Sequence, residues 1–256
     1  MTALMTLFAC YDFAGDEGRI GFVSDLQIES GTKWNPEHGI VGGSDATFVA
    51  VAEVDAEDGE ELPEVWGEAD GLRFAASEPY TLLVHGPNRG RGEAFFDGAL
   101  DDHFELRFRP ASEIVLVDLV GEELDAIAFA PGGETAVGVK VLDRWSRPLG
   151  YRADDLVVEA DGGLSAWPED GYLHLVADDA GGLRVDVLDA EIFTEVSIGE
   201  AHSSEIVPIH EEHDHIVLLH RAWTAEGTRV FGAPVEWPVG AEQVGPDLAM
   251  LATQPQ

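Results

Sequence analysis

Apolar and polar residues alternate with a period of two through much of the chain. The pattern is clearest at residues 104–109, 137–142 and 172–176, where successive side chains fall on opposite faces of an extended backbone. Such alternation is typical of β-strands with one face on a core. Segments rich in glycine, aspartate and proline separate these runs, as turns do between strands. The pattern predicts an all-β fold, and helical periodicity is almost absent.

Residues 114–129 are open to two interpretations. Their apolar side chains are spaced closely enough to suit an amphipathic helix. The stretch nevertheless opens with the largely β-branched residues 114–117, and Gly121 interrupts it. Both features favour extended structure. We therefore expect two strands here, with a helix as the alternative.

Two segments of the chain share a pattern at a spacing of 82 residues, namely residues 140–150 and 222–232. In each, a strand leads into a polar turn, a basic residue, an apolar pair and a glycine, and another strand follows. A fainter copy covers residues 49–63. A repeat of this period outranks any single motif as evidence about architecture. It predicts tandem domains.

This repeated pattern resembles the bacterial Ig-like (Big-type) domains of surface proteins and lipoproteins. The resemblance implies tandem Ig-like β-sandwiches and brings no chemical motif with it. We expect a signal or lipobox remnant and linker at residues 1–15, one sandwich at 16–130 and a second at 131–200. A His-rich linker and a C-terminal β-segment, part of a third unit, are expected at 201–256.

The chain is strongly acidic, with 50 Asp and Glu against 14 Lys and Arg and a net charge of −36. This balance argues against nucleic-acid binding and against attachment to anionic lipid surfaces, since both need clustered basic residues. Hydrophobic residues make up 45% of the chain, which is enough for folded cores. Because salt screens self-repulsion, a salt-adapted protein of this kind should melt at a higher temperature in about 1 M than in about 0.05 M NaCl.

The sequence Leu7-Phe8-Ala9-Cys10 resembles a bacterial lipobox, in which a small residue precedes the lipidated cysteine. Residues 1–10 lack the basic region of a signal peptide, so we expect the natural start to lie upstream. The resemblance implies lipidation of Cys10 and a cell-envelope location, outer-membrane-anchored, periplasmic or extracellular. The membrane would then be contacted only through this anchor. The alternative is a buried thiol in an N-terminal strand.

A histidine-rich segment at residues 210–215 is the strongest candidate for metal binding. In a strand, His213 and His215 project to one face about 6.5–7 Å apart, which suits a shared zinc, copper or nickel ion. His210, Glu211 and Asp214 are further candidate ligands. The spacing is one residue short of the helical His-Glu-x-x-His motif. A solvated linker between sandwich units explains the same residues.

Two further sequence features suggest ion binding. Residues 86–92 form a glycine-rich loop that carries Arg89 and Arg91, and no phosphate-binding Gly-Lys-Ser/Thr follows it. We interpret the loop as a hairpin whose arginines could meet a carboxylate of a partner or of this chain. Acidic clusters such as residues 97–102 suit calcium, but none matches a calcium-loop motif, and chance pairing explains them in so acidic a chain.

The chain has six tryptophans, which are expected in cores and at sandwich edges, with a sugar-stacking platform as the alternative. Trp145 and Trp167 lie near turns and are the two expected at the surface, where they would suit stacking on a sugar. No Gly-x-Ser-x-Gly elbow or other nucleophile motif is present. The chain is therefore expected to be non-enzymatic.

Together, these features predict a lipid-anchored structural or adhesive Ig-like module that binds a protein or glycan at the cell surface. No cofactor is expected, apart from zinc or calcium if the histidine or acidic residues bind metal. One alternative is a metal-binding protein or metal-dependent enzyme that uses residues 210–215. Another is a carbohydrate-binding module.

Overall fold

The computed structural model describes residues 11–29, 32–54, 62–76, 78–169, 171–211 and 215–252. Its regular elements are 25 strands and one short 3-10 helix, η1 (Ala153–Asp155), so the predicted all-β class is confirmed. None of the described elements is a helix long and apolar enough to cross a membrane.

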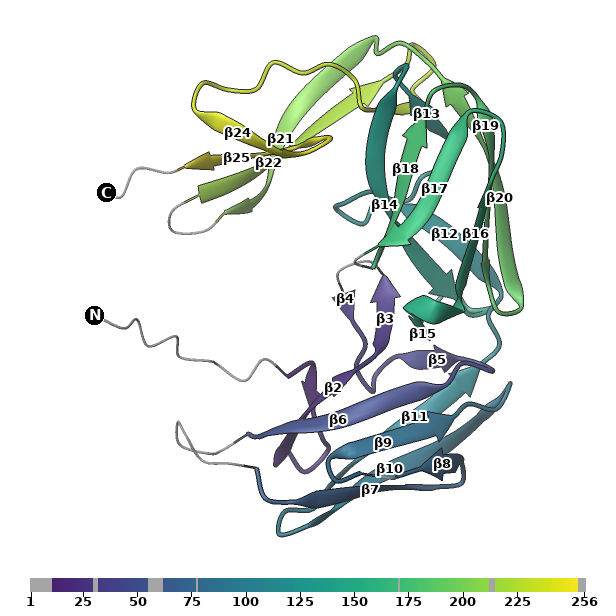
Figure 1. Ribbon diagram of the computed structural model, residues 1–256, viewed down its shortest axis with the longest axis vertical. Helices are drawn as coiled ribbons and strands as arrows, with labels where there is room; N and C mark the ends of the chain where they lie inside the picture. Colours follow the sequence, from purple (N-terminus) through teal and green to yellow (C-terminus); the bar gives the residue numbers. More distant parts are fainter. Residues whose placement is uncertain are drawn as a thin grey trace. The chain divides into compact units, whose positions relative to one another are not determined.

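The chain forms two compact units that interleave along the sequence (Figure 1). Unit 1 contains the described residues up to Glu113, together with Val141–Leu156 and Val187–Ala190. Unit 2 contains the remaining described residues, beginning at Ile114. Because the chain returns to unit 1 after entering unit 2, the units do not follow the predicted consecutive boundaries at residues 130 and 200.

Unit 1 consists of two sheets that share one core. The first has the order β1-β2-β6-β9-β8, and the second runs β15-β5-β11-β10-β7, with β3 on β15 and β4 on β3. The bounds are β1 (Phe13–Ala14), β2 (Ile20–Ser24), β3 (Leu26–Glu29), β4 (Thr32–Lys33), β5 (Gly39–Val41), β6 (Ala46–Glu53), β7 (Val65–Asp70), β8 (Arg73–Ala75), β9 (Thr81–His85), β10 (Gly90–Gly98), β11 (Asp102–Arg109) and β15 (Pro148–Arg152). Neighbouring strands are antiparallel, except that β5 runs parallel to β11 and β15.

Aromatic side chains from both sheets build the core of unit 1. Phe22 of β2 lies 4.8 Å from Phe96 of β10, and Phe48 of β6 lies 5.1 Å from Phe104 of β11, measured between ring centroids. Trp34 is fully buried among them. Contacts of this kind between facing sheets are those of a β-sandwich.

The predicted alternation holds in strand β11 and fixes where its charges lie. Phe104, Leu106 and Phe108 are buried, whereas Arg107 and Arg109 point away from the core. Because β-strand side chains alternate between faces, the same sequence that builds the core also presents a row of arginines on the other side of the sheet.

Unit 2 contains the remaining strands. One sheet has the order β16-β19-β20-β13-β23-β22-β25-β24, and β21 pairs with β22 at its side. The other strands form a separate group, in which β14 pairs with β18 and β12, and β17 pairs with β18. The bounds are β12 (Glu113–Val117), β13 (Ile127–Phe129), β14 (Gly133–Leu142), β16 (Leu156–Ala160), β17 (Leu164–Glu169), β18 (Tyr172–Ala177), β19 (Gly181–Val187), β20 (Ala190–Ile198), β21 (Ser203–Glu211), β22 (His215–Trp223), β23 (Arg229–Phe231), β24 (Ala241–Gly245) and β25 (Leu248–Ala252). β12, β14, β16, β19 and β20 begin or end in segments of unit 1.

Three local expectations can be compared with these strands. The segment 114–129 contains strands β12 and β13 and no helix, so the prediction of two strands is confirmed. Gly121, which interrupts the segment, has a φ of +82°. The expected linker after residue 200 is instead an antiparallel pair, β21 with β22. The loop at residues 86–89 joins β9 to β10, which pair in different sheets, so the hairpin prediction was wrong.

Candidate functional site

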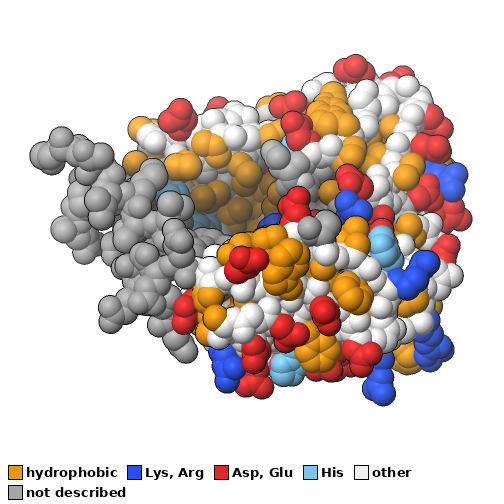
Figure 2. Space-filling view, turned by 60° about the horizontal axis from the view of Figure 1, so that its bottom comes forward, with side chains coloured by type: hydrophobic (Ala, Val, Ile, Leu, Met, Phe, Trp, Pro, Cys, Tyr) orange, Lys and Arg blue, Asp and Glu red, His pale blue; other side chains and the backbone are white. Residues whose placement is uncertain are grey.

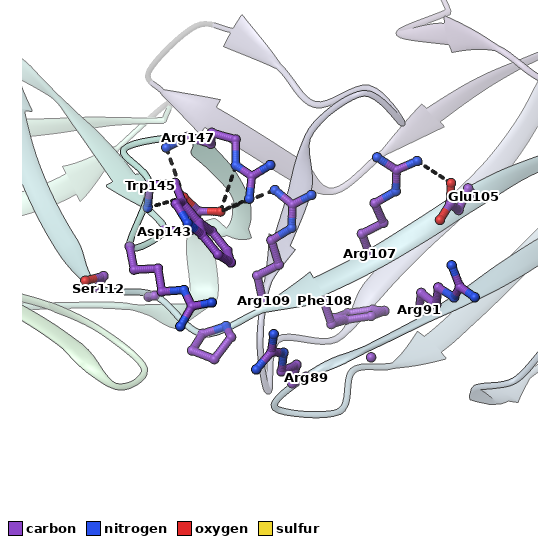
Figure 3. A pocket seen from close by; sticks show the side chains of 14 residues that line it. Arg89, Arg91, Glu105, Arg107, Phe108, Arg109, Ser112, Asp143, Trp145 and Arg147 are labelled. Carbon is purple, nitrogen blue, oxygen red and sulfur yellow. Dashed lines mark hydrogen bonds and ion pairs between the residues drawn. The ribbon is translucent and has the colours of Figure 1, made fainter.

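An arginine-lined pocket of about 740 Å³ lies in unit 1 (Figure 3). Its lining includes six of the chain's 14 basic residues but only two of its 50 carboxylates, Glu105 and Asp143. The six arginines are Arg89, Arg91, Arg107, Arg109, Arg144 and Arg147. In a chain of net charge −36, this is a local reversal of sign. We call it the arginine pocket.

Strand register brings four of these arginines together. Arg91 of β10 lies directly opposite Arg107 of β11. Arg109 follows two residues later on the same strand, and Arg89 immediately precedes β10. Like charges placed directly opposite each other on neighbouring strands destabilise a sheet. The arrangement therefore costs stability in the unliganded protein.

The turn between β14 and β15 supplies the other two arginines, and Asp143 organises it. The buried carboxylate of Asp143 accepts hydrogen bonds from the backbone N–H groups of Trp145 (2.8 Å) and Arg147 (3.1 Å). It also accepts hydrogen bonds from the guanidinium groups of Arg147, at 3.1 Å, and Arg109, at 3.3 Å. Asp143 thus fixes one arginine of the turn and one of β11 on a common anchor, as the dashed lines of Figure 3 show.

The protonation of Asp143 follows from these contacts. Burial alone would raise the pKa of the carboxyl, but the N–H groups of Trp145 and Arg147 and the guanidinium of Arg147 outweigh it and hold the pKa below its ordinary value. Asp143 therefore stays ionised at neutral pH and keeps its two arginines in place.

Trp145 supports two guanidinium groups at the edge of the pocket. Its side chain is 54% exposed, and the Cζ atoms of Arg144 and Arg147 lie 3.9 and 4.6 Å from its ring centroid. These are cation–π distances. A guanidinium that rests its face on a ring keeps the N–H groups along its edge for a ligand, and those groups match the two oxygens of a carboxylate or phosphate.

The lining of the pocket combines positive charge with apolar surface. Guanidinium groups dominate it, with apolar surface from Pro110, Ala111 and Trp145, and no histidine, cysteine or lysine occurs among these lining residues. Arg107 donates to Glu105, and this hydrogen bond lowers the pKa of the carboxyl. Both carboxylates of the pocket are thus tied to arginines. What remains suits recognition of an anion.

The structure brings together three of the residues singled out from the sequence. Arg89, Arg91 and Trp145 all line the arginine pocket. Trp167 belongs to β17 in unit 2. It is 39% exposed, as expected, but it stacks on His174 at 5.7 Å and its Nε1 donates to Glu169 at 3.0 Å.

Three of the five predicted metal ligands lie at the β21–β22 pair. His210 and Glu211 end β21, and His215 begins β22. His213 and Asp214 lie outside the described residues, as does Cys10. Within the described ranges, no three His, Cys, Asp or Glu side chains are grouped so as to hold a metal ion. Metal binding and lipidation stay predictions.

Sequence reasoning missed six charged members of the site, which are Glu105, Arg107, Arg109, Asp143, Arg144 and Arg147. Two signals were available. The alternation at residues 104–109 already placed two arginines on the outer face of a strand. The repeated turn at 140–150 carried the other two beside Trp145. What the sequence lacked was the pairing that joins these segments.

Comparison with known proteins yields solved structures alone, since neither a family model nor a curated protein matches the chain. Domains 5–6 of the S-layer protein SbsC match with 14% identity and a TM-score of 0.30, over 64% of this chain and 94% of that one. Adhesin InvE of Yersinia pseudotuberculosis matches with 12% identity and a TM-score of 0.27, over 92% of this chain and 76% of that one. The titin Ig tandem A164–A165 matches with 10% identity and a TM-score of 0.23, over 70% of this chain and 97% of that one. These neighbours are Ig-like and surface-protein domains, and likeness at this level carries no inference about what this chain binds.

Proposed function

We propose that this protein is a non-enzymatic adhesive module of the cell surface that binds an anionic ligand in the arginine pocket. The observation that carries the proposal is the concentration of charge. Six of 14 basic residues line one pocket together with two of 50 carboxylates. A purely structural sandwich has no need of this arrangement.

The energetics of the sheet support a binding role. Opposed Arg91 and Arg107 repel each other, and an acidic residue at either position would relieve that repulsion. An anionic ligand relieves it as well, because it places negative charge between the guanidinium groups. Charge-assisted hydrogen bonds of this kind contribute about 1.5–3 kcal/mol each. Ligand binding thus recovers stability that the unliganded sheet lacks.

The cell-envelope location and the lipid anchor at Cys10 are part of the proposal, and the lipobox-like sequence at residues 7–10 supports them. The test is fractionation of bacteria that express the gene together with its upstream sequence. Wild-type protein should sediment with membranes, and the Cys10→Ser variant should be released. Equal distribution of the two would contradict the anchor and leave the pocket unaffected.

The binding function is tested by isothermal titration calorimetry with citrate, sulfate and galacturonate in a phosphate-free buffer. The informative variant is Arg89→Gln with Arg144→Gln, since neither side chain pairs with a carboxylate of the described residues. Losing two charge-assisted contacts should weaken binding about a hundredfold or more. Arg73→Gln is the matched control, because Arg73 is an exposed arginine of unit 1 on strand β8, outside the pocket.

The expected result is binding of at least one anion by wild type and by Arg73→Gln, with loss in the double variant. Heat of binding that survives in the double variant would place the anion elsewhere. No heat with any of the three anions would contradict the binding function itself.

A further inference from the structure

The six arginines of the pocket fall into two groups. Three pair with its carboxylates, and these are Arg107, Arg109 and Arg147. The other three, Arg89, Arg91 and Arg144, lie within ion-pair distance of no carboxylate among the described residues. The paired group is held in position by the protein. The unpaired group has its hydrogen-bonding capacity open to a ligand.

The unpaired arginines approach the pocket from two separate segments. Arg144 comes from the β14–β15 turn, where its guanidinium rests on the Trp145 ring. Arg89 and Arg91 come from the start of β10. A ligand that contacts both segments is bound between the guanidinium groups of the turn and those of β10. Its anionic groups therefore have to lie within the pocket.

The size of the pocket matches a small molecule. About 740 Å³ falls within the range of 300–1,000 Å³ that is usual for small-molecule sites. Trp145, Pro110 and Ala111 add surface that suits an uncharged body. One or two sugar rings, with a carboxylate or sulfate, meet both requirements.

The rest of the molecule disfavours a long polyanion. All but two of the 50 carboxylates lie outside the lining, and on the face shown in Figure 2 acidic side chains are dispersed widely. A polymer that carries a charge on every unit would extend beyond the lining. Along β10, for example, Glu93 follows Arg91 on the same face of the sheet and lies opposite Asp70 of β7. Each of its outer charges would meet like charge, over a screening length of about 10 Å at 0.1 M salt.

We propose that the arginine pocket selects a compact anion, with one or two carboxylate or sulfate groups on an uncharged body of one or two sugar rings, and rejects long polyanions. This inference rests on the proposed function and names its ligand class. The local arginines supply the attraction, and the acidic remainder of the chain supplies the selectivity.

A chain-length series of one chemistry tests this selectivity. Galacturonate, digalacturonate and polygalacturonate are titrated into the full-length protein at 0.05 and 0.5 M NaCl, with methyl galactoside as the uncharged control. Two or three like-charge contacts at about 7 Å weaken binding about tenfold. At 0.05 M NaCl the polymer should therefore bind about tenfold more weakly per site than the monomer. At 0.5 M the difference should shrink to about twofold, since the repulsion is then screened.

The outcomes separate the two claims. Polymer that binds more tightly than monomer at 0.05 M and weakens steeply with salt would overturn the selectivity while leaving an anion site in place. Equal binding of polymer and monomer at both salt concentrations would also overturn it. If none of the series binds, and citrate and sulfate also fail, the proposed function falls with it. Arg144→Gln should weaken the monomer at least tenfold, and Arg73→Gln should leave it unchanged.

Discussion

Two turns of this protein have the same backbone and opposite charge. In unit 1, the N–H of Asp143 donates to the carbonyl of Arg147 at 2.9 Å, and that of Ser146 donates to Asp143 at 2.8 Å. In unit 2, the N–H of Thr224 donates to Thr228 at 2.9 Å, and that of Gly227 donates to Thr224 at 3.1 Å. The fourth residue is left-handed in both turns, with φ of +58° at Ser146 and +89° at Gly227.

What surrounds the two turns differs. The first borders the arginine pocket. The second borders a pocket of about 260 Å³ whose lining includes five acidic residues and a single arginine, Arg229. The two turns share a side-chain oxygen at the first position, which accepts backbone N–H groups of the turn, and a left-handed residue at the fourth. The charges around the turns differ although the backbone is the same, so the difference between the two pockets comes from side chains.

The largest effect is expected from Asp143→Asn. The amide loses the charge that holds Arg109 and Arg147, and repulsion among the pocket arginines is then unopposed. We expect a loss of about 2 kcal/mol in the free energy of unfolding at pH 7. In a chain of this size this corresponds to a fall of about 4–8 °C in the melting temperature by calorimetry.

The pH dependence of this loss is a further check on the same variant. A carboxyl whose pKa is lowered by folding contributes stability above its unfolded value, near about 3.9, and loses it as pH falls through the folded value. The difference in the free energy of unfolding between wild type and Asp143→Asn should therefore be constant from pH 6 to pH 8 and should disappear in acid. A gap independent of pH down to pH 2 would contradict the charge-clamp explanation.

A second buried acid, Asp247 of unit 2, gives the opposite pH response. Burial raises the pKa of Asp247 to about 6, although the Gly232 N–H and Arg229 act against it. Between about pH 4 and pH 6 the folded state thus holds a proton that the unfolded state releases, and this carboxyl adds stability as pH falls. Burial lowers the pKa of neighbouring His220, so this side chain has the opposite effect and makes the protein less stable in acid.

Asp247→Asn isolates the contribution of that carboxyl, since His220 remains. Relative to the variant, wild type should gain about 2 kcal/mol in free energy of unfolding between pH 7 and pH 4. Urea unfolding at four pH values measures the difference. Parallel stability curves for the two proteins would show that Asp247 titrates normally.

Reciprocal exchange at the fourth turn position should give a smaller effect. Gly227→Ala places a Cβ at a left-handed φ, and no atom lies within 4 Å of that Cβ, so the cost is backbone strain of about 1 kcal/mol. Ser146→Gly removes such strain from the first turn and should stabilise by about 0.5 kcal/mol, after the entropy of glycine is included. Opposite shifts of the two urea midpoints are expected, and shifts of the same sign would contradict the equivalence of the turns.

Thr224→Ala should also have a small effect. The Oγ1 atom of Thr224 accepts hydrogen bonds from the N–H groups of Glu226 and Thr228, both at 3.2 Å. In the variant, water can take over both hydrogen bonds because the turn is exposed. We expect a loss of about 0.5–1 kcal/mol by urea unfolding. A loss as large as that of Asp143→Asn would mean that the turn backbone, and not the arginine clamp, accounts for both.

The sequence predicted strands where apolar and polar residues alternate, as at residues 104–109, because alternation is a local property. It did not predict the β21–β22 pair, where a linker was expected. It identified the repeated turn, but with an error of one residue. In the structure, Asp143 and Thr224 occupy the same position of the two turns, because Leu142 pairs with Pro148 just as Trp223 pairs with Arg229. The two turns are therefore 81 residues apart, not 82. Sequence matching instead aligned Gly150 with Gly232. Ser146 takes the left-handed position without being glycine, so no glycine marks it.

The arginine pocket was only partly predictable. Arg89, Arg91 and Trp145 stood out in the sequence, but in separate segments. They converge because β10 pairs with β11 and because Asp143 reaches Arg109 across 34 residues of sequence. Long-range pairing of this kind depends on the whole fold, and neither local propensity nor spacing encodes it.

The most direct test of the central claim is an NMR titration of arginine Nε–H signals with galacturonate, assigned by single Arg→Lys variants. The structure leaves Arg89, Arg91 and Arg144 open to a ligand, so their signals should shift together with one dissociation constant. Arg73 on β8 and Arg184, which pairs with acidic residues of unit 2, should not move. Shifts confined to Arg73 or Arg184, or equal shifts at every arginine, would contradict an anion site in the arginine pocket.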